Sequence, residues 1–107
     1  MKRITSISLL LGLGAMALAL GTMGKVFNDT YNVKADSNLG KAKCAVCHAK
    51  TTGGALNPYG TDLKAALNGS KKLTSAMLKS VEGKDSDGDG RKNIDEIKAD
   101  KMPGKKD

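Results

Sequence analysis

The chain has 107 residues and a formal net charge of +7, with two cysteines, one histidine and three aromatic side chains. This length suits one small domain. The cysteine and histidine counts exclude a four-ligand zinc site built from these residue types, and the scarcity of aromatic rings argues against nucleic-acid binding by base stacking.

The first 23 residues have the pattern of an export signal. A basic start precedes an apolar run from Ile7 to Leu20, and Ala17-Leu18-Ala19 is a candidate cleavage site. If it is not cleaved, the run from Ile4 to Met23 approaches the length that spans a bilayer. We therefore expect residues 1–23 to be a signal peptide or an N-terminal membrane anchor. The rest of the chain is then exported to the periplasm or held on the outer face of the cytoplasmic membrane.

The next feature is a compact reactive motif. Residues 24–37 are polar with little periodicity and predict a flexible tether. Cys44-Ala45-Val46-Cys47-His48 follows, and C-x-x-C-H is the pattern of covalent haem attachment. In that chemistry the two thiols bond to the haem vinyl groups and the histidine ligates the iron on the proximal side. A redox-active disulfide is the alternative for a bare C-x-x-C pair, but it calls for a longer βαβ context than this chain offers.

The remaining segments predict short helices. No segment alternates as a strand does, and the paired glycines of Thr51–Gly54 predict a loop. Asn57–Gly60 predicts a turn, and Thr61 is a candidate N-cap for the helix after it. We expect an all-α domain over residues 38–107, wrapped around one covalently bound haem that supplies the apolar body missing from so small a core. The expected helices are 38–48, 62–67, 74–82 with Thr74 as N-cap, and 93 towards 101.

Residues 85–96 fit the twelve-residue EF-hand calcium loop. Aspartates occupy positions 1, 3 and 5, glycine position 6, asparagine position 9 and glutamate position 12. Lys92 at position 8 replaces the apolar residue of paired loops, so we expect a lone site with a weak Kd of about 10⁻⁴–10⁻³ M. A generic acidic turn is the alternative. The expected ligands of a structural Ca²⁺ are Asp85, Asp87, Asp89, the backbone carbonyl of Arg91, Asn93 and Glu96.

Residues 38–101 resemble the single-haem class I cytochromes c. Cys44, Cys47 and His48 match the family motif, and Pro58 matches a proline about ten residues further on. The resemblance implies that residues 38–107 form a cytochrome c-like domain and that the carbonyl of Pro58 orients the ring of His48. It extends to small exported bacterial cytochromes that carry an Asn-Pro-Tyr-Gly segment, here 57–60, and an Asp-Ser-Asp-Gly-Asp-Gly loop, here 85–90.

The sequence departs from this family at the sixth iron ligand. Class I members supply a methionine from a loop before the C-terminal helix, and the calcium-type loop takes that place here. Met102 and Met77 are the candidate ligands, and an open, water-ligated or Lys-ligated iron is the alternative. A second histidine ligand from the same chain is excluded, because His48 is the only one.

The expected function is that of an electron carrier and not an enzyme. Scattered lysines suit docking to redox partners with an acidic surface. An open sixth position instead favours a sensor or a weak peroxidase, and calcium that switches the iron ligation is a third reading. We expect no nucleic-acid partner, and membrane contact only through an uncleaved N-terminus.

Overall fold

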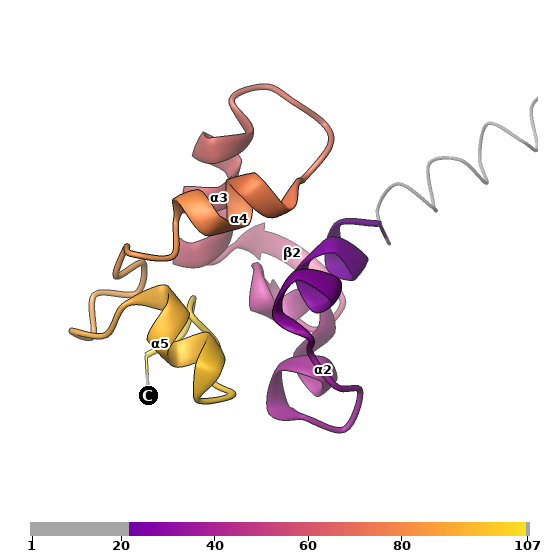
Figure 1. Cartoon of the computed structure of the whole chain (residues 1–107), viewed down its shortest axis with the longest axis vertical. Coiled ribbons are helices and arrows are strands. Elements are labelled where there is room, and N and C mark those ends of the chain that lie inside the picture. The colour runs from indigo at the N-terminus through magenta and orange to yellow at the C-terminus, as the bar shows by residue number, and fades with distance from the viewer. Residues whose placement is uncertain (1–21, 107) are drawn as a thin grey trace, which may run out of the picture.

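The structure is a computed structural model that describes residues 22–106 (Figure 1). The predicted signal or anchor, residues 1–23, therefore lies almost entirely outside the described residues. Within residues 22–106, no helix is long and apolar enough to cross a bilayer.

The described elements follow one another with short connections. Residues 22–31 form a helix, here called the N-terminal helix. After it come α2 (Asn38–Ala42), the 3₁₀ helix η1 (Lys43–Val46), β1 (His48–Lys50), β2 (Gly53–Leu56), α3 (Pro58–Leu67), α4 (Ser75–Ser80) and α5 (Asn93–Lys98).

The all-α prediction is wrong, because β1 and β2 form a two-stranded antiparallel sheet. His48 pairs with Leu56, and Lys50 pairs with Gly53. Gly53 and Gly54 have φ of 119° and 90°, which the absence of a Cβ permits, and this allows the hairpin to turn back on itself. Both strands are short and mostly exposed, so they never develop the alternating pattern that marks a half-buried strand.

The flexible tether predicted over residues 24–37 is also wrong for its first half. The N-terminal helix runs to residue 31, and its Phe27 is only 4% exposed. The ring of Phe27 meets Tyr31 and Tyr59 edge-on, at centroid distances of 5.2 and 6.1 Å. Met23, Val26, Phe27 and Tyr31 recur at helical spacing, and this apolar stripe holds the segment on the domain.

The continuous helix predicted over residues 38–48 is broken at Lys43. Ser37 caps α2 by accepting the amide of Gly40 at 3.0 Å. Lys43 then takes a positive φ of 52°, which ends α2 and starts η1. Cys44 therefore lies in a tight 3₁₀ turn, and His48 opens β1 instead of ending a helix.

The later helices keep their predicted places with shifted ends. Asn57, not Thr61, is the N-cap of α3, with Pro58 at its first position. The cap predicted for α4 is confirmed, since Thr74 accepts the amide of Met77 at 3.3 Å. Asn68 closes α3 in the left-handed conformation, and α5 ends at Lys98.

The core draws on each of these helices. Figure 1 shows α3 and α4 together on one side of the molecule, α5 below them, and the N-terminal helix and α2 across from α5. The buried hydrophobic side chains are Phe27, Leu39, Ala42, Val46, Tyr59, Leu63, Leu73, Leu78, Val81 and Ile97.

Gly60→Ala is expected to destabilise the fold by about 1–3 kcal/mol. A Cβ at Gly60 would lie 2.0 Å from the backbone carbonyl oxygen of Cys47, so α3 would have to move away from the motif. Gly83→Ala is the matched control, because a Cβ there meets nothing within 4 Å. Its stability should stay within about 0.5 kcal/mol of wild type. Urea unfolding measures both, and equal midpoints would contradict the prediction.

Candidate functional site

The side chain of Asn57 is hydrogen-bonded to the backbone of the C-x-x-C-H motif. Its Nδ2 lies 3.0 Å from the carbonyl oxygen of Ala45, 2.9 Å from that of Val46 and 3.3 Å from that of His48. An amide nitrogen carries two hydrogens, so they are shared among these three acceptors. One side chain thus gathers carbonyl groups that point inward from the whole turn.

The backbone around Asn57 tightens the same contact. The amide of Asn57 donates to the carbonyl of Cys47 at 2.9 Å, and its Oδ1 accepts the amide of Gly60 at 2.9 Å as the N-cap of α3. Gly104 packs so closely on the Asn57 side chain that a Cβ there would lie 2.3 Å from Oδ1. The motif, the start of α3 and the C-terminal segment therefore meet at Asn57.

The imidazole of His48 is half-buried and oriented by the hairpin. Its Nδ1 lies 2.9 Å from the carbonyl oxygen of Gly54. A carbonyl only accepts, so Nδ1 carries the proton and the lone pair lies on Nε2, the arrangement of a metal-ligating histidine. The predicted orienting carbonyl was that of Pro58, which instead sits exposed at the first position of α3. The structure gives this place to Gly54.

The two cysteines differ in environment. Cys44 is exposed and Cys47 is half-buried, and both are free thiols. Burial, with a smaller contribution from Cys44, raises the pKa of Cys47 to about 11. Cys47 is therefore a neutral thiol at pH 7, and Cys44 is the more accessible of the two.

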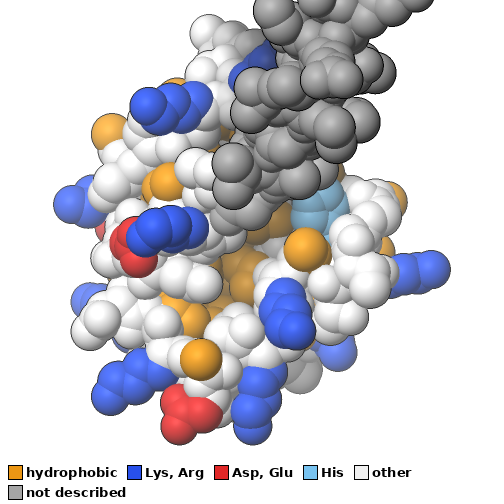
Figure 2. Space-filling view, turned by 90° about the vertical axis from the view of Figure 1, so that its right-hand side faces the viewer, with side chains coloured by type: hydrophobic (Ala, Val, Ile, Leu, Met, Phe, Trp, Pro, Cys, Tyr) orange, Lys and Arg blue, Asp and Glu red, His pale blue; other side chains and the backbone are white. Residues whose placement is uncertain are grey.

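Hydrophobic side chains lie on the surface beside His48 (Figure 2). In Figure 2 the imidazole, the one pale-blue side chain, lies at the edge of a recess with hydrophobic side chains on its floor and Lys or Arg side chains around it. Ala45 and Cys47 of the motif are partly buried against the hydrophobic core. The residues present therefore suit a haem bound at one edge through the two thiols.

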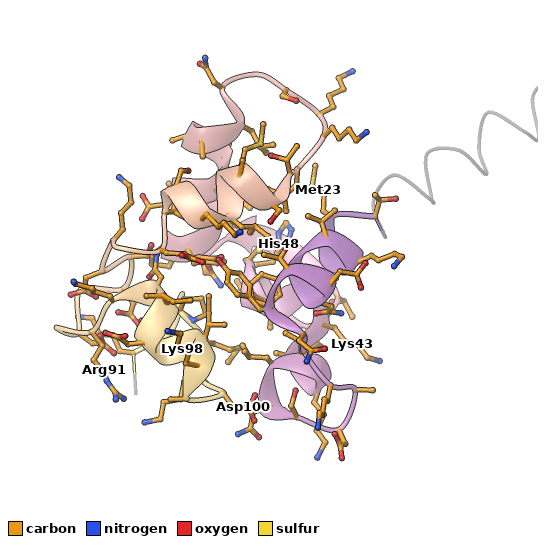
Figure 3. The ribbon with its side chains drawn as sticks, in the orientation of Figure 1. Met23, Lys43, His48, Arg91, Lys98 and Asp100 are labelled. Carbon is orange, nitrogen blue, oxygen red and sulfur yellow. The ribbon has the colours of Figure 1, made fainter. Side chains whose placement is uncertain are left out.

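Within residues 22–106, three methionines lie partly buried against the core, one more than the two that the sequence analysis named. Met77 belongs to α4 and Met102 follows α5. Met23, which the sequence analysis assigned to the signal, belongs to the N-terminal helix and is labelled in Figure 3. Ligation by Met77 or Met102 stays a prediction.

The predicted calcium loop gathers its acidic residues. Asp85, Asp87, Asp89 and Glu96 each offer a carboxylate oxygen, and these oxygens lie within 4.8 Å of one another. Two oxygens on opposite sides of a Ca²⁺ lie about 4.6–5.2 Å apart, because each Ca–O bond is about 2.3–2.6 Å. The cluster therefore has the dimensions and the all-oxygen chemistry of a calcium site.

Glu96 is the least ordinary member of this cluster. It is 0% exposed, and neither of its carboxylate oxygens has a hydrogen-bond partner, as is also true of Oδ2 of Asp87. Burial, and then the neighbouring Asp87 and Asp89, raise the pKa of Glu96 to about 8, and burial also raises the pKa of Asp87. Burying carboxylate oxygens without hydrogen-bond donors destabilises the folded state unless a cation faces them.

The loop backbone is already folded around Asp85. Its carboxylate accepts the amides of Gly88 at 3.0 Å, Asp89 at 3.2 Å and Gly90 at 2.8 Å. These bonds, with that of Gly90 the strongest, lower the pKa of Asp85. Gly90 has a φ of 91°, which suits the sharp turn predicted at position 6.

Two predicted calcium ligands have other partners. Asn93 is fully buried, and its Nδ2 donates to the carbonyl of Val81 at 2.9 Å and to Oγ of Ser86 at 2.8 Å. Its Oδ1 accepts the amide of Ser86 at 3.2 Å, so this side chain ties the loop to the fold. Arg91 is exposed and its amide donates to Asp89 at 3.0 Å, while ligation by its carbonyl stays a prediction.

Sequence reasoning missed Asn57 and Gly54. For Asn57 a signal existed, since an asparagine directly before a proline is typical of a helix N-cap. For Gly54 there was none, because its role depends on the hairpin. No protein-family model, curated protein or solved structure matches the chain.

Asn57→Asp is expected to destabilise the protein by about 1–3 kcal/mol. Aspartate is as good an N-cap as asparagine, so the loss reports the missing donor to the three motif carbonyls. Asn68→Asp is the control, at an exposed left-handed position that both residues tolerate. Urea unfolding that gives equal losses for the two variants would count against this role.

In calcium-free buffer, stability is expected to fall as pH rises from about 5 to about 8. The folded-state pKa of Glu96 is raised to about 8, so the folded state holds this proton more tightly than the unfolded chain. The contribution is fully present below the ordinary pKa of glutamate and is lost as pH rises through the folded value, with a slope of at most about 1.4 kcal/mol per pH unit.

Thermal unfolding across this pH range measures the effect, and millimolar Ca²⁺ should restore the midpoint at pH 8. Glu96→Gln should flatten the profile and abolish the calcium response. Asp95→Asn, at an exposed position of the same helix, should keep both. A flat wild-type profile without calcium would show that Glu96 is not held in this way.

Proposed function

We propose that the chain is an exported monohaem c-type cytochrome that carries single electrons between redox partners. The observation that carries this proposal is the motif itself: two free thiols, followed by an imidazole whose Nδ1 is engaged by Gly54. Cys44 and Cys47 would anchor the haem, and Nε2 of His48 would ligate its iron. A bound haem supplies a one-electron couple.

The chain's own residues do the positioning. The carbonyl of Gly54 accepts the proton of Nδ1 of His48, fixes the ring orientation and leaves Nε2 as the nitrogen that would face the iron. Asn57 holds the turn that carries both thiols, so their spacing is set by a single side chain. A motif held by these hydrogen bonds suits electron transfer, which needs no substrate pocket.

The surroundings of the motif suit an acidic partner. Lys41, Lys43 and Lys50 are exposed and flank the motif on both sides. Opposite charge on a partner would speed encounter and fix its orientation, and this effect would weaken with salt.

We also propose that residues 85–96 bind Ca²⁺ as a structural ion. The supporting observation is the fully buried carboxylate of Glu96, whose two oxygens have no donor and face other carboxylates. A hard cation would satisfy these oxygens, with Asp85, Asp87, Asp89 and Glu96 as its side-chain ligands.

Expression with a haem-attachment system is expected to yield covalently bound haem at one per chain. Cys44→Ser/Cys47→Ser should lose it, and absence of covalent haem in wild type would contradict the proposal. The ferrous protein should not bind CO, whereas CO binding without denaturant would favour the rival open-site sensor or weak peroxidase.

The same sample can identify the sixth ligand. Met23→Leu, Met77→Leu and Met102→Leu are matched variants, because leucine keeps the apolar volume and removes the sulfur. The variant that loses the low-spin spectrum and gains CO binding identifies the ligand. Three unchanged spectra would exclude methionine ligation by these residues, and repeating the series in chelator tests whether calcium affects the iron.

A further inference from the structure

Asp100 joins the end of α5 to the start of the helix that leads into the motif. Its Oδ2 accepts the amide of Asn38 and its Oδ1 accepts the amide of Leu39, both at 2.9 Å. Both amides belong to the first turn of α2, where the helix itself offers them no carbonyl acceptor. This helix begins six residues before Cys44. The two bonds lower the pKa of Asp100, with that of Leu39 the stronger. Figure 3 shows Asp100 between the two segments.

The backbone at Asp100 favours glycine, yet the chain has aspartate there. Asp100 has a φ of 60° and closes α5 in a Schellman motif. In this motif the amide of Lys101 donates to the carbonyl of Glu96 at 2.8 Å, and the amide of Asp100 donates to that of Ile97 at 3.1 Å. Glycine would adopt this conformation without the steric strain of a Cβ. The aspartate is therefore explained by the hydrogen bonds that its carboxylate accepts from α2.

Glu96 takes part in both halves of this arrangement. Its side chain lies in the acidic cluster, and its carbonyl accepts the amides of Ala99 and Lys101, which flank Asp100. Whatever holds the Glu96 side chain in place therefore also holds the turn that aims the Asp100 carboxylate. Without a cation, repulsion among the clustered carboxylates works against that placement.

A second connection leads from the loop to the other support of the motif. Oγ of Ser86, inside the loop, donates to Oδ2 of Asp62 at 2.5 Å. Asp62 belongs to α3, whose N-cap is Asn57. The acidic loop is thus bonded directly to α3, and α5, which follows it, is connected to α2 through Asp100.

From these contacts we infer that a divalent cation bound by Asp85, Asp87, Asp89 and Glu96 stabilises the haem-attachment segment. The stabilisation acts through the two hydrogen bonds that Asp100 accepts from Asn38 and Leu39, here called the Asp100 clamp. This inference rests on the calcium and haem functions proposed above, and it adds a regulatory link between the two sites. By reciprocity, loss of the clamp weakens calcium binding by the factor with which calcium strengthens the clamp.

The test is amide hydrogen exchange of the full chain, in chelator and in millimolar CaCl₂ at matched ionic strength. In wild type, calcium should slow exchange at Asn38 and Leu39 as well as in α5. Asp100→Gly keeps the left-handed backbone and removes both acceptors, so the effect at Asn38 and Leu39 should vanish. Calorimetry should then show calcium affinity weaker by about 5- to 150-fold.

Matched variants keep the outcome clear. Asp36→Asn removes an equal charge from an exposed position near the start of α2 and should leave calcium affinity and exchange as in wild type. Asp100→Asn keeps the backbone and one acceptor, and it should fall between wild type and Asp100→Gly.

Calcium that protects α5 but leaves Asn38 and Leu39 unchanged would overturn the coupling and leave the calcium site intact. No calcium binding at all would overturn both. Haem content, read from the absorbance of the same samples, tests the cytochrome proposal separately.

Discussion

The placement of the C-x-x-C-H turn depends on one side-chain amide. The turn that carries the two cysteines and His48 points three backbone carbonyl groups towards Asn57. Asn57 places one nitrogen near these three carbonyl oxygens, while its own oxygen starts α3. The close approach that this requires explains the glycine at position 60, where a Cβ would clash with the carbonyl oxygen of Cys47.

Local features could be predicted from the sequence, and features that depend on distant contacts could not. The calcium loop is contiguous, so the spacing of its aspartates and Glu96 was enough to predict the cluster that the structure forms. The cap at Thr74 and the end of α3 at Asn68 are local in the same way. The hairpin was missed because its strands are too short and too exposed to carry a pattern, and the roles of Asn57, Gly54 and Asp100 arise only when separate elements meet.

Electrostatics divides the molecule into two regions with opposite requirements. Around the motif, exposed lysines leave a positive surface, on which the proposal of an acidic partner rests. At the loop, carboxylates are brought together and one of them is fully buried, which favours the fold only when a proton or a cation is present. Among residues 22–106 of a chain with a net charge of +7, the two buried carboxyl groups, Asp87 and Glu96, lie together, next to the helix that connects to α2 through Asp100.

The hairpin also decides which changes of length the chain can accept. The contact of Gly54 with His48 joins its two strands, and the hydrogen bond of Asn57 to Cys47 fixes the end of β2 against the motif. Its tip, Thr51 and Thr52, is exposed. Residues added at the tip would lengthen a surface loop at little entropic cost, whereas one residue added between Leu56 and Asn57 would shift the amide away from the carbonyls it serves. Related chains should therefore vary in length at positions 51–52 and keep the spacing from Gly54 to Gly60 constant.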